Sequence, residues 1–74
     1  MQPERWKRLS ENRFAVEISE ETNLSAASLM YFMRKIPFAF RKEFKKIEWA
    51  GDYEEYGKRF GIITAEIKDS GKQR

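Results

Sequence analysis

The sequence predicts one small, mainly α-helical domain with a strand near its C-terminus. Apolar residues recur at helical spacing between residues 25 and 49. Residues 62–67 alternate between apolar and polar side chains, as a strand does. The chain has 74 residues, too few for two domains of about 100–200 residues each. We expect residues 1–68 to form the domain and the polar residues 69–74 to form a disordered tail.

The N-terminal part of the chain fits two interpretations. Pro3 suits the first turn of a short helix over residues 3–9. Phe14 and Ile18 are spaced to share one helical face, and Asn12 would cap a helix that runs to Glu21. Residues 13–18 also alternate as a strand. The strand interpretation gives an alternative α+β fold, in which residues 13–18 and 62–67 form a two-stranded sheet with helices packed on one face.

Residues 25–36 form the clearest predicted helix. Ser25 is suited to cap its N-terminus, and Pro37 ends it at or before Ile36. Its apolar residues lie at positions i, i+3, i+4 and i+7 and make one continuous stripe: Leu29, Phe32, Met33 and Ile36. We expect this stripe to face the core.

The second half of the chain predicts two further helices. Phe40, Phe44 and Ile47 repeat the helical spacing over residues 37–49, and Gly51 suits the end of that helix. Asp52 would cap a short helix over residues 52–60. A chain this short needs nearly all of its aromatic residues in the core. We therefore expect burial of Phe38, Phe40, Phe44, Trp49, Tyr53, Tyr56 and Phe60.

The composition excludes several classes of function. The chain has no cysteine and no histidine, so it has no disulfide, no zinc finger and no His-based proton transfer. The four glycines stand singly, which excludes a glycine-rich phosphate loop. We expect a protein that is not an enzyme and that binds no cofactor and no metal.

The N-terminal sequence and the length of the apolar runs predict the cellular location of the protein. The N-terminus has no apolar stretch behind its charged residues, and the longest apolar run is far shorter than the roughly 20 residues that span a bilayer. We expect a cytoplasmic protein with no membrane partner.

The segment of residues 18–35 resembles a helix-turn-helix DNA-binding domain, closest to its MerR-like and phage-excisionase-like branch. Ser19 takes the small position of the first helix, and Asn23 takes the turn. An aliphatic residue and a serine follow the turn, as in the family, and Leu29 and Phe32 take the buried positions of the recognition helix. The run Met30-Tyr31-Phe32 stands where that branch has Arg-Tyr-Tyr.

This resemblance implies a transcriptional regulator or an excisionase-like factor that inserts helix 25–36 into the major groove of double-stranded DNA. Ser25 would meet a phosphate, and Ala27, Ser28 and Tyr31 would face base edges. Six basic residues would hold the DNA backbone: Arg34, Lys35, Arg41, Lys42, Lys45 and Lys46. One copy would bury little DNA surface, so we expect specificity to require a homodimer or adjacent copies.

The same residues also fit a protein–protein interaction module, such as an inhibitor or an adaptor. Met30 and Tyr31 lie off the apolar stripe, and tyrosine, methionine and arginine are common at interfaces. Together with the basic face of helix 37–49, they would bind an acidic protein partner. Salt separates the two hypotheses, because affinity for DNA falls steeply as salt rises.

Overall fold

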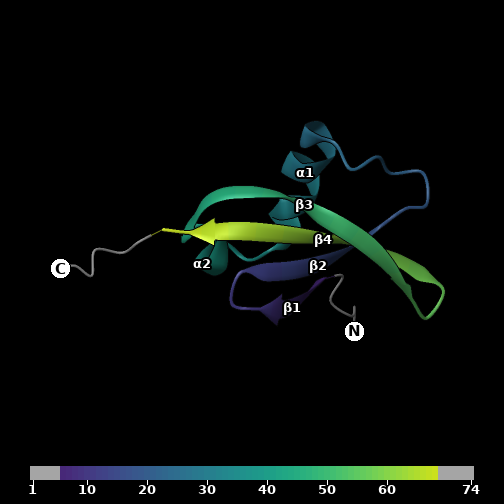
Figure 1. Ribbon diagram of the computed structural model, residues 1–74, viewed down its shortest axis with the longest axis horizontal. Helices are drawn as coiled ribbons and strands as arrows, with labels where there is room; N and C mark the ends of the chain where they lie inside the picture. Colours follow the sequence, from purple (N-terminus) through teal and green to yellow (C-terminus); the bar gives the residue numbers. More distant parts are fainter. Residues whose placement is uncertain (1–5, 69–74) are drawn as a thin grey trace.

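The computed structural model describes residues 6–68 and shows a mainly β protein, so the predicted mainly helical fold is wrong. Four antiparallel strands form one sheet in the order β1, β2, β4, β3 (Figure 1). The strands are β1 (Trp6–Ser10), β2 (Arg13–Ile18), β3 (Phe44–Glu55) and β4 (Lys58–Ile67). Between β2 and β3 lie α1 (Ala26–Phe32), the 3-10 turn η1 (Met33–Lys35) and α2 (Phe38–Arg41).

The sheet buries one face beneath the helical segment. Phe14, Val16 and Ile18 alternate along β2, so they point to the same side of the sheet, and all three are buried. Ile63 lies opposite Phe14 on β4 and joins this cluster. Leu29 of α1 and Ile36, which follows η1, complete the cluster from the helical side. The core therefore lies between one face of the sheet and the helical segment.

The alternative prediction, a two-stranded sheet, was wrong in its number of strands. Residues 13–18 do pair with the C-terminal strand, with Phe14 opposite Ile63 and Ala15 opposite Ile62. However, β1 pairs with the free edge of β2, and β3 pairs with the free edge of β4. The two additional strands satisfy backbone groups that a two-stranded sheet would leave unpaired.

Strand β2 takes the place of the first helix of the predicted helix-turn-helix. As a strand it buries three alternating side chains, whereas a helix would bury Phe14 and Ile18 alone. Residues 18–35 consequently contain one α-helix, α1, instead of two. The predicted N-cap of that helix is confirmed, because the Ser25 Oγ accepts a hydrogen bond from the Ser28 N–H at 3.2 Å. The helical backbone also ends before Pro37, as predicted.

The predicted helix over residues 37–49 is wrong, because only α2 is helical there and β3 begins at Phe44. The register of β3 against β4 shifts between Phe44 and Lys46, which marks a β-bulge. One extra residue in a strand lets side chains three apart face the same side. Phe44 and Ile47 therefore both contact the core, at a spacing that imitates a helix.

The predicted helix over residues 52–60 is also wrong. Residues 52–55 end β3, and residues 58–60 begin β4. Tyr56 and Gly57 connect the strands with φ angles of 54° and 73°. Positive φ at both central residues is typical of a type I′ hairpin turn. This hairpin extends beyond the end of β2 (Figure 1).

The N-terminal segment forms an edge strand. The predicted helix over residues 3–9 is wrong where the structure describes it, because Trp6 begins β1 and lies opposite Val16. Residues 1–5 and the predicted disordered tail, residues 69–74, lie outside the described part. No helix within residues 6–68 is long and apolar enough to cross a membrane.

Candidate functional site

The helical segment, residues 26–41, is attached to the sheet through a small number of inward-pointing side chains. Leu29 and Ile36 are buried, and the Phe40 ring centroid lies 5.8 Å from that of Phe14. The opposite side of the segment exposes large apolar side chains. Met30, Tyr31 and Phe38 are 62%, 61% and 65% exposed, respectively. Tyr31 was expected off the core, whereas Phe38 was expected inside it and is not.

Trp49 fixes the start of α1 against the sheet. Its indole Nε1 donates a hydrogen bond to the Ser25 carbonyl oxygen at 2.9 Å. The indole ring lies against Gly61 on the adjacent strand β4, and a Cβ atom at Gly61 would collide with it. Glycine therefore provides the space that the Trp49 ring occupies.

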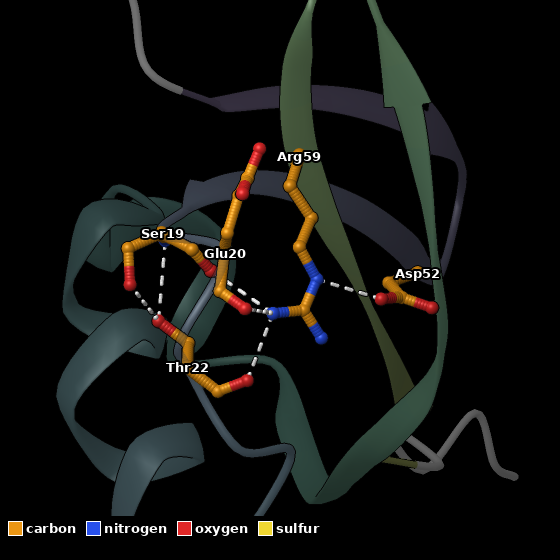
Figure 2. A network of polar contacts seen from close by, with 5 residues as sticks. All are labelled: Ser19, Glu20, Thr22, Asp52 and Arg59. Atoms are coloured by element: carbon orange, nitrogen blue, oxygen red, sulfur yellow. Dashed lines mark hydrogen bonds and ion pairs between the residues drawn. The ribbon is translucent and has the colours of Figure 1, made fainter.

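Arg59 fixes the loop that precedes α1 (Figure 2). Its Nη1 donates to the carbonyl oxygens of Ser19, Glu20 and Thr22 at 2.9, 3.0 and 2.9 Å. Its Nε donates to the Asp52 carboxylate at 2.7 Å. One guanidinium therefore connects β4, β3 and the loop, so α1 starts from a defined position on the sheet.

The residue predicted to meet a phosphate and the three residues predicted to face base edges lie together on and beside α1. Ser25, Ala27, Ser28 and Tyr31 line a shallow hollow of about 470 Å³. The loop residues on its other side include Glu21, with Glu20 exposed in the same loop. The Ser25 Oγ already binds Ser28, and α1 has only seven residues. Carboxylates beside so short a helix disfavour contact with phosphates.

The structure separates one of the six predicted basic contacts, Lys46, from the other five. Arg34 and Lys35 lie in η1, Arg41 and Lys42 lie at the end of α2, and Lys45 and Lys46 begin β3. We call the first five of these residues the basic segment: Arg34, Lys35, Arg41, Lys42 and Lys45.

Lys46 is separated from the basic segment by the sheet. It lies opposite Glu66 in the register of β3 and β4, on the face away from Ile47 and the core. It also lines a hollow of about 580 Å³ together with three carboxylates, those of Glu11, Glu48 and Glu66. An anion would therefore meet repulsion at this position.

The cations of the basic segment are not neutralised within the described residues. The ion pairs there join Lys7 to Glu55 at 2.8 Å, Arg59 to Asp52 at 2.7 Å and Lys58 to Glu17 at 4.0 Å. None of these pairs includes the basic segment, and Glu43 is the only acidic residue between positions 22 and 47. Positive charge therefore accumulates along η1, α2 and the adjoining start of β3.

The face of the sheet that the helices leave uncovered is different, because its charges balance. By the strand register this face carries Lys7, Arg13, Lys46 and Lys58 together with Glu17, Glu48, Glu55 and Glu66. The hydrogen bond to Glu55 raises the pKa of Lys7 above its ordinary range.

Two aromatic rings that were predicted in the core also lie on this uncovered face. Tyr53 and Phe60 stack with centroids 5.5 Å apart, and the Lys7 ammonium lies 5.7 Å from the Phe60 centroid. Their direct pairing across β3 and β4 places both on one face, a placement that depends on the hairpin register. The sequence contained no signal for this pair once residues 52–60 were interpreted as a helix.

No protein-family model, curated protein or solved structure matches this chain. Within residues 6–68, no three carboxylates gather closely enough to hold a metal ion.

Proposed function

We propose that the protein binds a nucleic acid through the basic segment. The supporting observation is that this segment carries five cations, none of them in an ion pair with a described carboxylate, whereas Lys7, Lys58 and Arg59 each form such a pair and Lys46 lies opposite Glu66. Clustered, unpaired lysine and arginine side chains attract phosphates, because their binding releases counterions from the nucleic acid. The calculated isoelectric point of about 9.3 agrees with such a partner.

The contact surface in this proposal differs from the one that the helix-turn-helix resemblance implied. Groove insertion by α1 is not part of it, because the helix is short and its first turn adjoins the acidic loop. Phosphate contacts come instead from η1, α2 and the start of β3. Arg34 and Lys42 are both exposed, so neither must break an internal contact to reach a phosphate.

Reversing one charge of the basic segment tests this proposal. We expect Lys42→Glu to weaken binding of a labelled duplex and of a labelled single strand by about tenfold at low salt. The loss of one phosphate contact also makes the plot of log affinity against log salt less steep by roughly 1. Fluorescence anisotropy over a series of salt concentrations measures both quantities.

Lys46→Glu is the matched control, because it changes the net charge equally but lies on the uncovered face of the sheet. Its effect should be several times smaller than that of Lys42→Glu. Equal weakening by both variants would show that net charge alone governs binding. Affinity that does not respond to salt would contradict a phosphate-binding surface altogether.

Protein docking on α1 is the second candidate function, and Met30 is the observation that favours it. Its side chain is 62% exposed, and methionine is enriched at protein interfaces. An acidic protein partner would contact Met30, Tyr31 and the adjacent cations. Binding of an acidic protein that persists at high salt and is lost in the Met30→Gln variant would support this candidate instead.

A further inference from the structure

Resting on the proposed function, we propose that the ligand is a single-stranded nucleic acid and that Phe38 is a platform on which one of its bases stacks. Aromatic side chains within a positively charged surface are the usual means of holding unpaired bases, because every base has a π-face. Phe38 lies inside the basic segment, between Lys35 and Arg41 in the chain.

The fold does not need Phe38 for packing. In α2 the inward-pointing aromatic residue is Phe40, whose ring lies 5.8 Å from Phe14 and 6.0 Å from Trp6. Phe38 is 65% exposed and is absent from the core cluster and from the residues packed against it. A ring this exposed adds little to stability, so its free surface is available to a ligand.

Arg41 supports the Phe38 ring from one side. The Arg41 guanidinium carbon lies 5.5 Å from the Phe38 ring centroid. The Arg41 Nε donates a hydrogen bond of 2.8 Å to the Ile36 carbonyl oxygen, which limits the movement of the guanidinium. A cation and an aromatic ring are therefore held together, and they offer a phosphate contact beside a stacking surface.

Tyr31 provides a second exposed ring near a cation of the basic segment. It packs edge-on against Phe32, with centroids 4.9 Å apart and ring planes at 89°. Tyr31 and Lys35 line the same hollow of about 310 Å³. Since this hollow also includes Glu17, we assign the main stacking position to Phe38 and a supporting one to Tyr31.

A duplex offers no base face to the Phe38 ring, because its bases are stacked on one another and present only their edges in the grooves. Single strands present base faces, which aromatic side chains contact directly. Exposed rings beside unpaired cations therefore favour a single strand over a duplex of equal charge.

Binding to three labelled probes of equal length tests this inference: an oligothymidylate single strand, the same strand with abasic sites in place of its bases, and a duplex. We expect Phe38→Ala and Phe38→Leu to weaken binding of the oligothymidylate by about 5- to 150-fold. Neither variant should change binding of the duplex or of the abasic strand, since neither probe offers a free base face. Leucine keeps the apolar bulk but removes the π-face, so Phe38→Leu separates stacking from simple apolar contact.

Tyr56→Leu is the matched control, because Tyr56 is an exposed aromatic residue outside the basic segment. It should leave all three affinities unchanged. Nuclear magnetic resonance adds a direct readout, since a stacked base shifts the Phe38 ring protons upfield. Far-ultraviolet circular dichroism verifies that each variant is folded.

The outcomes distinguish this inference from the proposed function. If Phe38→Ala leaves oligothymidylate binding intact while Lys42→Glu weakens it, the stacking platform is wrong and the nucleic-acid function stands. Equal loss for the abasic strand would also overturn the platform. If neither the strand nor the duplex binds at low salt, the inference and the proposed function both fail, and protein docking remains.

Discussion

Arg59 shows how one side chain determines where a loop lies. Its guanidinium binds three carbonyl oxygens of residues 19–22 and the Asp52 carboxylate. A planar group with five N–H donors suits several acceptors at once, whereas an ammonium is a point charge on a flexible chain. The loop that leads into α1 therefore depends on arginine in particular, and not only on positive charge.

We expect Arg59→Lys to lower the free energy of unfolding by about 1–2 kcal/mol, because it keeps the charge but loses most of these hydrogen bonds. Urea denaturation measures the change. Lys58→Ala, at the neighbouring position, removes only a long surface ion pair and should change the stability by less than about 0.5 kcal/mol. If the Arg59→Lys variant is as stable as the wild type, water satisfies the loop carbonyl oxygens as well as the guanidinium does.

At the scale of elements, the β3–β4 hairpin contains a local conflict. Tyr56 has a φ of 54°, a conformation that bulky residues adopt rarely, and its side chain is 92% exposed. Asparagine followed by glycine is the preferred pair for a type I′ turn. The long pairing of β3 with β4 imposes the turn geometry on a residue that does not favour it.

Tyr56→Asn should therefore raise the free energy of unfolding by about 0.5–1 kcal/mol, since asparagine tolerates the left-handed conformation better. Thermal and urea unfolding of the two proteins provide the comparison. Tyr56→Leu should give no such gain, because leucine meets the same backbone restriction. A less stable Tyr56→Asn variant would indicate that the tyrosine ring makes stabilising contacts in the folded state.

At the scale of the whole molecule, Phe14 connects most of the structure. Its ring lies 6.1, 5.8 and 5.4 Å from the rings of Trp6, Phe40 and Phe44. These rings come from β1, α2 and the start of β3, while Phe14 itself lies in β2. A domain of this size has little other core, so the loss of this side chain affects several elements at once.

We expect Phe14→Ala to lower the free energy of unfolding by about 3–5 kcal/mol, a large part of the total stability of a small domain. Urea unfolding, or loss of the folded state, reports this change. Phe38→Ala removes the same side chain from an exposed position and should change the stability by less than about 0.5 kcal/mol. Similar losses in both variants would contradict the placement of the core.

Charge is also distributed over the whole molecule. The helical segment and the start of β3 carry the basic segment, whereas on the uncovered face of the sheet Lys7 and Lys58 form ion pairs and Lys46 lies opposite Glu66. Lys45 and Lys46 are adjacent in the sequence, yet only Lys46 has been placed among acidic neighbours by the sheet. The sequence predicted that Lys45 and Lys46 share the basic face of one helix, whereas the strand register separates Lys46 from that group.

The sequence by itself determined the local features whose physical cause is local. Ser25 caps α1 because its hydroxyl lies three residues before the Ser28 N–H, and Pro37 ends the helical backbone. The concentration of positive charge after residue 33 is likewise a property of the chain alone. The alternation of Phe14, Val16 and Ile18 also offered the correct interpretation of residues 13–18, but helical spacing competed with it.

The tertiary structure alone decided the features that depend on strand pairing. The bulge between Phe44 and Lys46 places Phe44 and Ile47 on one side at a helical spacing, so the periodicity of residues 37–49 misled the prediction. The hairpin register brought Tyr53 and Phe60 together on the uncovered face. The packing of Phe40 against the core left Phe38 exposed beside Arg41. Strands that pair can lie far apart in the chain, as β2 and β4 do, and neither local propensity nor residue spacing determines which strands pair with each other.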